Sequence, residues 1–280
     1  MMITLSMVPR RGRNRTGSRT VPKPYLTDEQ WLVIEDLFPW QRTTPWGGRP
    51  LVPPRECLEG ILWILISGAR WKDLPERYPS PSTCWRRLNQ WVVNGVFEQA
   101  WARLLGKLDR FHHINWRETI GDGTFAPAKK GGDDVGKTKK GKGTKIMILV
   151  DGEGIPLAAN IASASEAEVN LIEPLVESSL LACKCRPQRL MYDRAADSDP
   201  LRESLAANSI ELICPHRRNR KRPPTQDGRK LRRYKRRYRV ERTISWLGTR
   251  RRLLVRYEYW NYIFEGFVQL ACLFTILQRF

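Results

Sequence analysis

Residues that bind soft metals are scarce in this sequence. Six cysteines are scattered over 280 residues, none of them in a C-x-x-C pair, and there are three histidines. Structural zinc sites use cysteine and histidine at short, regular spacings, so no zinc site is expected. Near the N-terminus the basic residues follow a short apolar run, which is the wrong order for a secretory signal. We therefore expect reduced thiols in a cytoplasmic protein.

Long hydrophobic runs are also missing. The apolar run from Leu270 to Leu277 is far shorter than the roughly 20 residues that span a bilayer. It predicts a core helix, and no membrane partner is expected. The Gly- and Lys-rich segment 129–145 lacks the order G-x-x-x-x-G-K-[ST], which argues against a nucleotide-binding P-loop.

Acidic residues are in deficit. The chain has 49 Lys and Arg against 29 Asp and Glu, which gives a formal charge of +20. Such an excess indicates an anionic partner, most often nucleic acid. With 280 residues, 41% of them hydrophobic, and eleven Trp, the chain can form one large or two modest domains with a substantial core.

The N-terminal part is predicted to be helical. Residues 1–24 are expected to form a disordered basic arm, and residues 25–114 a helical domain in which Thr27 begins a capping box. A helix expected to be capped by Ser82 carries four polar side chains on its outer face: Arg86, Arg87, Asn89 and Gln90. Arg pairs with guanine and Asn or Gln with adenine, so this face predicts a helix-turn-helix-like recognition helix. An ordinary solvated face is the alternative.

From residue 117 onward the pattern changes to short apolar or β-rich runs that alternate with helical stretches. These runs are TIGDGTF, KIMILVD, PLAANIA, RLMYD and IELICP. They predict the order β-β-β-α-β-α-β followed by helices, which fits an α/β protein with a mixed sheet and helices on both faces.

Two basic segments interrupt this order. Residues 129–145, with Lys139 and Lys140, are predicted to be a mobile loop that contacts phosphate. Residues 215–230, with Arg217 and Arg218, fit a solvated linker, a second DNA contact, or both.

Three carboxylates could form a metal site. Asp122 lies in a Gly-flanked strand, Asp193 ends a buried strand, and Glu241 lies among Arg and Lys. An acid at the end of a buried strand is costly unless it is paired or metal-bound, and hard oxygen ligands suit Mg²⁺ or Mn²⁺. Each acid is equally compatible with an ordinary salt-bridged or capping role, because only the fold can bring the three together.

The segment around Glu241 is predicted to be a helix. Tyr234, Arg237 and Glu241 follow at spacings of three and four, so they share one face. A carboxylate for metal and cations for phosphate are what an enzyme that cuts phosphodiesters needs.

A series of motifs runs in order from about Tyr25 to Arg279. They are LTDEQW, GRP, ILWILISGARWKDLPERY, STCWRRLNQW, DGTF, TKIMILVDGEGIPL, YDRAADSDPLR, PHRRNRK and YKRRYRVERTISWLGTRRRL. In this order they resemble bacterial insertion-sequence DDE transposases, specifically the insertion sequence five group. The resemblance implies an RNase H-like catalytic domain over residues 115–280, preceded by the helical DNA-binding domain.

Matched residue by residue, the resemblance assigns the catalytic and metal-binding roles to Asp122, Asp193 and Glu241. It implies Mg²⁺ or Mn²⁺, with two ions at the site. Among residues expected at the DNA, Tyr234 and Arg237 match the Tyr-x-x-Arg of the family, Lys235 joins Arg237 at the phosphate, and Trp246 stacks on a base.

The sequence departs from the family pattern at two places. Gly248 stands where the family has a basic residue, with Arg250 and Arg251 as the nearest cations. Ala195 and Ala196 stand where a Tyr often follows the second aspartate. Both departures bear on whether this copy is active.

The implied function is transposition of an insertion sequence. A homo-oligomer would bind the terminal inverted repeats and the target as double-stranded DNA, then cleave and transfer strands, in the bacterial cytoplasm at the nucleoid. Two alternatives remain open at this point: a catalytically decayed relative that acts as a repressor, and an RNase H-like nuclease without strand transfer.

Overall fold

The computed structural model describes residues 23–40, 47, 50–183 and 187–280. The arm predicted for residues 1–24 lies almost wholly outside the described residues. In the part of the chain that the structure describes, no helix is both long and apolar enough to cross a membrane.

Helices dominate the N-terminal part, as predicted. They are α1 (Asp28–Leu32), η1 (Glu35–Leu37), α2 (Pro54–Ser67), η2 (Trp71–Asp73), α3 (Pro81–Val93) and α4 (Val96–Arg110). The capping box at Thr27 is confirmed, because the Thr27 and Gln30 side chains each accept the other's backbone N–H. The expected cap at Ser82 is wrong: Ser80 caps α3, since Pro81 has no N–H to satisfy and fits the first helical position.

A mixed sheet forms the centre of the second part. Its strands are β1 (Thr119–Pro127), β2 (Gly136–Thr138), β3 (Gly141–Asp151), β4 (Pro156–Ser163), β5 (Arg189–Met191) and β6 (Glu211–Ile213). β3 pairs antiparallel with β1, β2 and β4, whereas β5 runs parallel to both β1 and β6. All five predicted strands are present, and β2 is additional.

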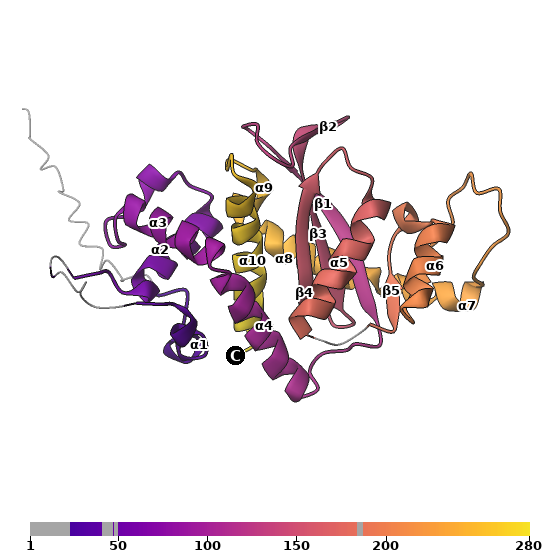
Figure 1. The fold of residues 1–280 in the computed structure, drawn as a ribbon, viewed down its shortest axis with the longest axis horizontal. Coiled ribbons are helices and arrows are strands. Elements are labelled where there is room, and N and C mark those ends of the chain that lie inside the picture. The colour runs from indigo at the N-terminus through magenta and orange to yellow at the C-terminus, as the bar shows by residue number, and fades with distance from the viewer. Residues whose placement is uncertain (1–22, 41–46, 48–49, 184–186) are drawn as a thin grey trace, which may run out of the picture.

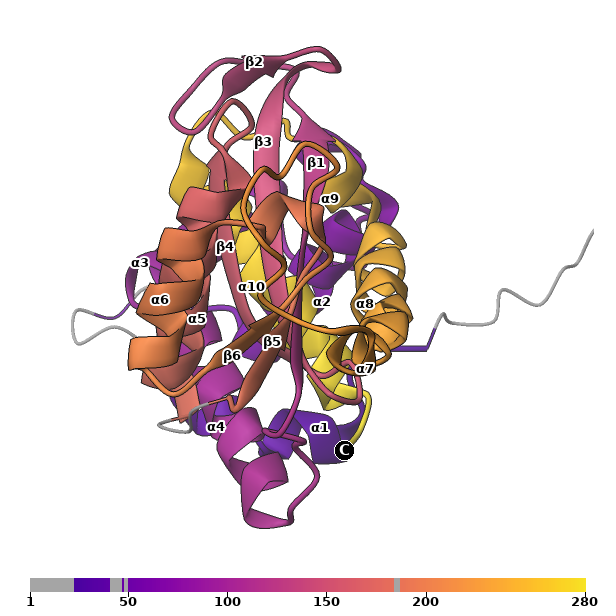
Figure 2. The same cartoon turned by 90° about the vertical axis from the view of Figure 1, so that its right-hand side faces the viewer.

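The prediction of a mobile loop at residues 129–145 is wrong for its second half. Residues Gly136–Thr138 pair with Gly141–Gly143, so Lys139 and Lys140 form the turn of a hairpin that extends from the sheet (Figure 2). Glycine at 136 permits this, because a Cβ there would lie 2.2 Å from the Ser163 hydroxyl oxygen. The polar composition concealed the strand.

Helices cover both faces of the sheet. They are α5 (Glu168–Cys183), η3 (Arg194–Ala196), α6 (Asp199–Ala207), α7 (Gly228–Leu231), η4 (Arg233–Arg237), α8 (Tyr238–Gly248), α9 (Arg251–Leu254) and α10 (Asn261–Leu277). Figure 2 shows α5 and α6 on one side and α8 on the other. Alternation along β3 explains this, because Met147 and Leu149 join the core under α5, whereas Ile146 and Ile148 join the core under α8 and α10.

The C-terminal helix α10 lies between the N-terminal helices and the sheet (Figure 1). Its side chains are buried almost throughout, as expected for the apolar run from Leu270 to Leu277. Gly266 allows close packing, because a Cβ there would lie 2.3 Å from a Val92 methyl on α3. One hydrophobic core therefore joins α2, α3 and α4 to α10 and one face of the sheet.

Candidate active site

Asp122 lies in the middle of β1, opposite Ile148 of β3. The glycine before it is required by packing, since a Cβ at Gly121 would lie 2.7 Å from the Tyr192 ring. The parallel register pairs Ile120 with Met191. Continued by two residues, it brings Asp122 beside Asp193 at the end of β5, on the face that carries Ile120.

Asp193 follows β5 directly and begins η3. One of its carboxylate oxygens accepts the backbone N–H of Ala195 at 2.8 Å, which fixes the turn out of the strand. Ala196 is fully buried at this turn, in the core under α5. The small side chain at 196, a departure from the family pattern, thus fits a packed position.

Glu241 comes to the same place from α8, which packs against β1 and β3. Arg237, one turn earlier, connects the acids. Its guanidinium donates to an Asp122 oxygen at 2.6 Å and lies 3.6 Å from a Glu241 oxygen. It also donates to the Tyr234 hydroxyl at 3.3 Å, so the face predicted for Tyr234, Arg237 and Glu241 is confirmed.

The electrostatics at Asp122 are those of a crowded acidic site. Burial raises the pKa of the Asp122 carboxyl, the charge of Arg237 opposes the rise, and the nearby Asp193 adds to it. Burial works against the charge on Arg237 as well, but Asp122 and Tyr234 raise the pKa of Arg237 overall. Arg237 therefore opposes the effect of burial on Asp122, and Asp122 favours the charged form of Arg237.

A fourth carboxylate, which sequence reasoning missed, lies at the same site. Glu168 begins α5, and burial together with repulsion from Asp193 and Asp122 raises its pKa, against the pull of Lys145. The Lys145 ammonium is 3.6 Å from a Glu168 oxygen. Glutamate near a helix start is common, because it favours the helix dipole, so the sequence carried no signal for this residue.

The donor chemistry at Asp122 and Asp193 fits a divalent ion. Their oxygens are hard ligands, and their mutual repulsion is relieved by a cation. Among the residues described, however, no group of three or more His, Cys, Asp or Glu lies close enough to hold an ion. Glu241 is separated from Asp122 by the Arg237 guanidinium, so it can join the two aspartates only where Arg237 gives way.

The predicted recognition helix is α3, and its outer face lines a cavity of about 530 Å³ with the segment before α2. Arg86, Arg87 and Gln90 line this cavity, and Arg87 donates to the Gln90 side chain at 3.0 Å. Asn89 does not line this cavity. Its half-buried side chain accepts from the Tyr262 hydroxyl of α10 at 2.9 Å.

The basic segment after β6 is folded back on the turn that carries Asp193. Arg217 donates to the carbonyl oxygens of Arg194 and Ala195, at 3.1 and 2.7 Å. Its backbone N–H donates to the buried Asp197 at 2.8 Å. Arg217 thus supports η3, although it is exposed to solvent as Arg218 is.

Asp197 is the residue that these supporting contacts share. Burial opposes its charge, yet the Arg217 N–H and the side chains of His216 and Arg202 lower the pKa of Asp197 to about 2. Asp199, the first residue of α6, pairs with Arg220 and Arg222, at 2.7 and 2.9 Å.

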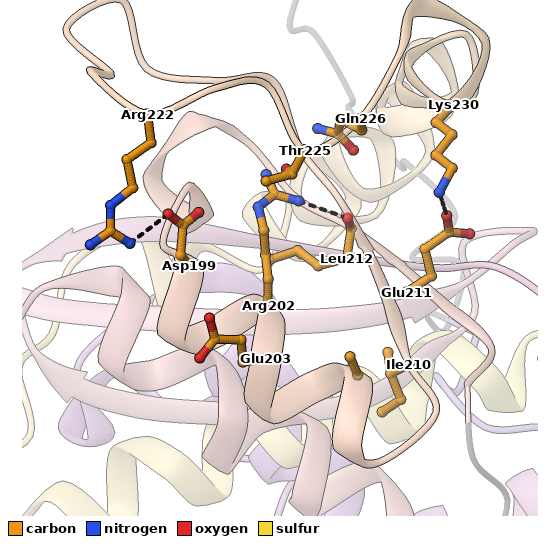
Figure 3. Close-up of a pocket in the computed structure, with 11 residues that line it drawn as sticks. Asp199, Arg202, Glu203, Ile210, Glu211, Leu212, Arg222, Thr225, Gln226 and Lys230 are labelled. Atoms are coloured by element: carbon orange, nitrogen blue, oxygen red, sulfur yellow. Dashed lines mark hydrogen bonds and ion pairs between the residues drawn. The ribbon is translucent and has the colours of Figure 1, made fainter.

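A neighbouring cavity is lined by charged side chains that pair with other groups of the protein. This cavity of about 480 Å³ lies between α6, β6 and the segment before α7 (Figure 3). Arg222 faces Asp199, Arg202 donates to the Leu212 carbonyl at 3.0 Å, and Lys230 lies 2.6 Å from Glu211. These contacts thus hold the segment to the sheet.

The remaining predicted DNA contacts differ in exposure. Lys235, Trp246 and Arg251 are exposed on η4, α8 and α9, and the guanidinium of Arg242 lies 4.9 Å from the Trp246 ring. Arg250 is half-buried, with its guanidinium 4.7 Å from the Phe274 ring. Arg250 therefore packs against α10, and Arg251 is the better placed of the two cations for a phosphate.

A mixed sheet with helices on both faces is the architecture predicted for an RNase H-like domain. The fold is similar to that of the piggyBac transposase in a cryo-EM structure of its synaptic complex with hairpin DNA. The two share a TM-score of 0.51 and 12% identity, over 91% of this chain and 73% of that chain.

Family models match both parts of the sequence. A model described as "Transposase DDE domain" matches residues 117–276, and one described as "Putative transposase of IS4/5 family" matches residues 26–101. The chain therefore belongs to the DDE transposases, enzymes that cleave and transfer DNA strands. This confirms the resemblance to the insertion sequence five group, and domains of this family generally act with a divalent metal ion.

Two curated relatives come from Burkholderia cepacia. An "Insertion element IS402 uncharacterized 16.2 kDa protein" is 38% identical over 120 residues, which cover 41% of this chain and 82% of that protein. A "Putative transposase for insertion sequence element IS402" is 34% identical over 136 residues, which cover 46% of this chain and 61% of that protein.

Proposed function

We propose that this transposase binds the ends of its own insertion sequence and cuts and transfers their strands at Asp122, Asp193 and Glu241. The observation that carries the proposal is the meeting of β1, β5 and α8. The register of β1 and β5, extended past Ile120 and Met191, would set the two aspartates side by side, and Arg237 joins Asp122 to Glu241. An ordinary structural acid would not need two further acids around it.

The site would hold Mg²⁺ or Mn²⁺, with two ions during the reaction. A pair of such ions activates the attacking oxygen and stabilises the leaving oxygen of a phosphodiester. Asp122 and Asp193 would contribute oxygens from the sheet. Glu241, whose side chain is 56% exposed, would contribute from α8 once Arg237 turns to the DNA.

The cations beside the acids would position the scissile phosphate. The Nε of Arg237 is buried and has no hydrogen-bond partner among the described residues, so a phosphate oxygen would satisfy it. Lys235, exposed next to Tyr234, would hold a neighbouring phosphate. Trp246 would stack on a base near the cut, since its ring is 41% exposed.

The DNA is expected to span both parts of the molecule. Arg86, Arg87 and Gln90 on α3 would read the terminal repeats, and the hairpin turn with Lys139 and Lys140 would hold phosphates. Two copies of the chain would hold two element ends together at the bacterial nucleoid. The excess positive charge of the chain supports binding to DNA that spans both parts of the molecule.

The proposal is tested by cleavage of a supercoiled plasmid that carries the element ends, in Mg²⁺ and in Mn²⁺. Asp193→Asn should abolish nicking at the ends and leave DNA binding intact, because it removes metal-binding charge with little change of shape. The matched control is Asp227→Asn at the start of α7, where asparagine caps equally well and nicking should persist.

Each other outcome has a meaning. Nicking by Asp193→Asn at the normal rate would refute the site. Binding without nicking in the native protein would favour a decayed relative that acts as a repressor. Nicking without joining to target DNA would favour a nuclease without strand transfer.

A further inference from the structure

Glu168 lies close to the strand that carries Asp122. It begins α5, a helix that packs on β3 and β4, yet its carboxylate reaches across to β1. A Cβ built on Gly123 would lie 3.3 Å from a Glu168 oxygen. The carboxylate therefore lies against the backbone of the residue that follows Asp122. Any side chain at 123 would displace it.

Tyr192 is an independent sign of a ligand at the same place. It is fully buried directly before Asp193, and its ring lies against Gly121. Its hydroxyl has no hydrogen-bond partner among the described residues, although a buried hydroxyl without a partner is costly. The Tyr192 ring lies against Gly121 and the Glu168 carboxylate against Gly123, so the two side chains flank the backbone of Asp122 on one face of the sheet.

The chain's own cations account for the present positions of the acids. Arg237 holds Asp122 at 2.6 Å, and Lys145 stands 3.6 Å from Glu168. Lys145 is also anchored by the Glu166 carbonyl at 2.7 Å. Each of these two acids is thus turned to a separate cation, which explains why no three of the acids lie within coordination distance of one point.

We propose that Glu168 is a fourth carboxylate of the metal site, supplying an oxygen to a divalent cation held by Asp122 and Asp193. The Tyr192 hydroxyl would donate to the bound Glu168 carboxylate or to a water on the ion. This inference rests on the metal site proposed above. A plain salt bridge to Lys145 would require neither the approach to Gly123 nor the buried hydroxyl.

The test is a titration of the full chain with Mn²⁺ in the absence of DNA. The electron paramagnetic resonance signal of the free ion measures how much Mn²⁺ is bound. Glu168→Gln should bind Mn²⁺ about tenfold more weakly than the native protein, or lose one of two ions. Glu166→Gln is the matched control: it makes the same change two residues away, on an exposed side chain. Equal binding by the two variants would overturn the proposal.

A second variant keeps the proposal testable if Glu168→Gln does not fold. Lys145→Gln removes the cation that competes for Glu168, so Mn²⁺ binding should become several-fold tighter. A structural salt bridge would instead give lower thermal stability with unchanged Mn²⁺ affinity, and that result would overturn the proposal.

Asp193→Asn in the same titration separates the two proposals. Weak binding by Asp193→Asn with normal binding by Glu168→Gln would refute the role of Glu168 alone. Normal binding by Asp193→Asn would refute the metal site itself. Weak binding by both variants, with normal binding by Glu166→Gln, is the expected result.

Discussion

Arg237 is the side chain on which the acidic site depends. It donates to Asp122 at 2.6 Å, lies 3.6 Å from Glu241, and is itself largely shielded from water. A guanidinium here compensates the carboxylates, and a phosphate arriving beside a metal ion would compete for the same donors. The charge of this residue is thus needed both before and after DNA binds.

Arg237→Gln should lower the rate of cleavage about a hundredfold, as loss of a charged donor at a reacting phosphate does. The pKa of Asp122, already raised by burial, should rise further, because Arg237 opposes the rise. Activity that needs ionised Asp122 should then fail at a higher pH on the acidic side. Rates against pH would show the shift.

The control is Arg239→Gln on α8, which breaks an ion pair with Glu153 in the turn between β3 and β4. Surface pairs of this kind contribute about 1 kcal/mol or less, so the acidic limb should not move. An unshifted limb in Arg237→Gln as well would contradict the assigned role of Arg237.

At the scale of single residues, the sequence identifies some residues of the candidate site and gives no sign of others. Asp122, Asp193 and Glu241 were identifiable because motifs surround them. Glu168 was not, since nothing distinguishes it from Glu166 except the distance to Gly123, which only the fold sets. The hydrogen bond from Tyr262 to Asn89 likewise could not be foreseen, because it joins α10 to α3.

At the scale of elements, periodicity predicted most of the fold. The apolar runs identified β1 and β3 to β6, and the amphipathic pattern identified α2 to α4. The hairpin turn at β2 escaped, because its pairing depends on Gly136 fitting beside Ser163, a contact between segments distant in sequence. Composition describes a segment alone, whereas pairing needs a partner.

The face of α3 offers a paired test within one helix. Arg86→Ala should lower the ratio of specific to non-specific DNA affinity about tenfold, since a base contact contributes about 1–3 kcal/mol. Asn89→Ala should leave that ratio unchanged and cost about 1 kcal/mol of stability through the lost bond from Tyr262. Fluorescence anisotropy with element-end and random duplexes measures the ratio. Equal ratios for Arg86→Ala and the native protein would exclude a reading role for Arg86.

The segment after β6 should make the stability of the fold depend on pH in the acidic range. Asp197 is depressed to a pKa of about 2, below the value of 3.8 for a free aspartate. A depressed carboxyl stabilises the fold above its unfolded pKa, and the contribution is lost as the pH falls through its folded pKa. Asp197 should therefore contribute about 2 kcal/mol above pH ~4, a contribution lost toward pH ~2.

Asp197→Asn should remove that contribution at neutral pH and weaken the dependence of unfolding on acid. Asp28→Asn, which touches only an exposed pair with Arg55, is the control and should cost less than about 1 kcal/mol. Denaturant unfolding at several pH values measures both. An Asp197→Asn variant as stable as the native protein would show that Arg217 and His216 hold η3 without it.

At the scale of the whole molecule, the helical part and the sheet share one core. Trp101 of α4 donates to the Pro156 carbonyl of β4 at 3.1 Å, and Gln30 donates to the Leu277 carbonyl of α10 at 2.9 Å. The division of the chain at residue 114 remains a prediction about function. Physically, the last helix of the chain completes the packing of the first ones.

Residues 25–114 alone should therefore not fold. Without α10, buried side chains such as Trp91 and Leu104 would face water, and burying a large apolar side chain contributes about 1.5–3 kcal/mol. The full chain should unfold in one cooperative transition, with circular dichroism and tryptophan fluorescence coinciding. A fragment of residues 25–114 with cooperative melting and dispersed amide signals would contradict the shared core. In that case α10 would pack against a domain already formed, and the DNA-reading helix could move relative to the acids.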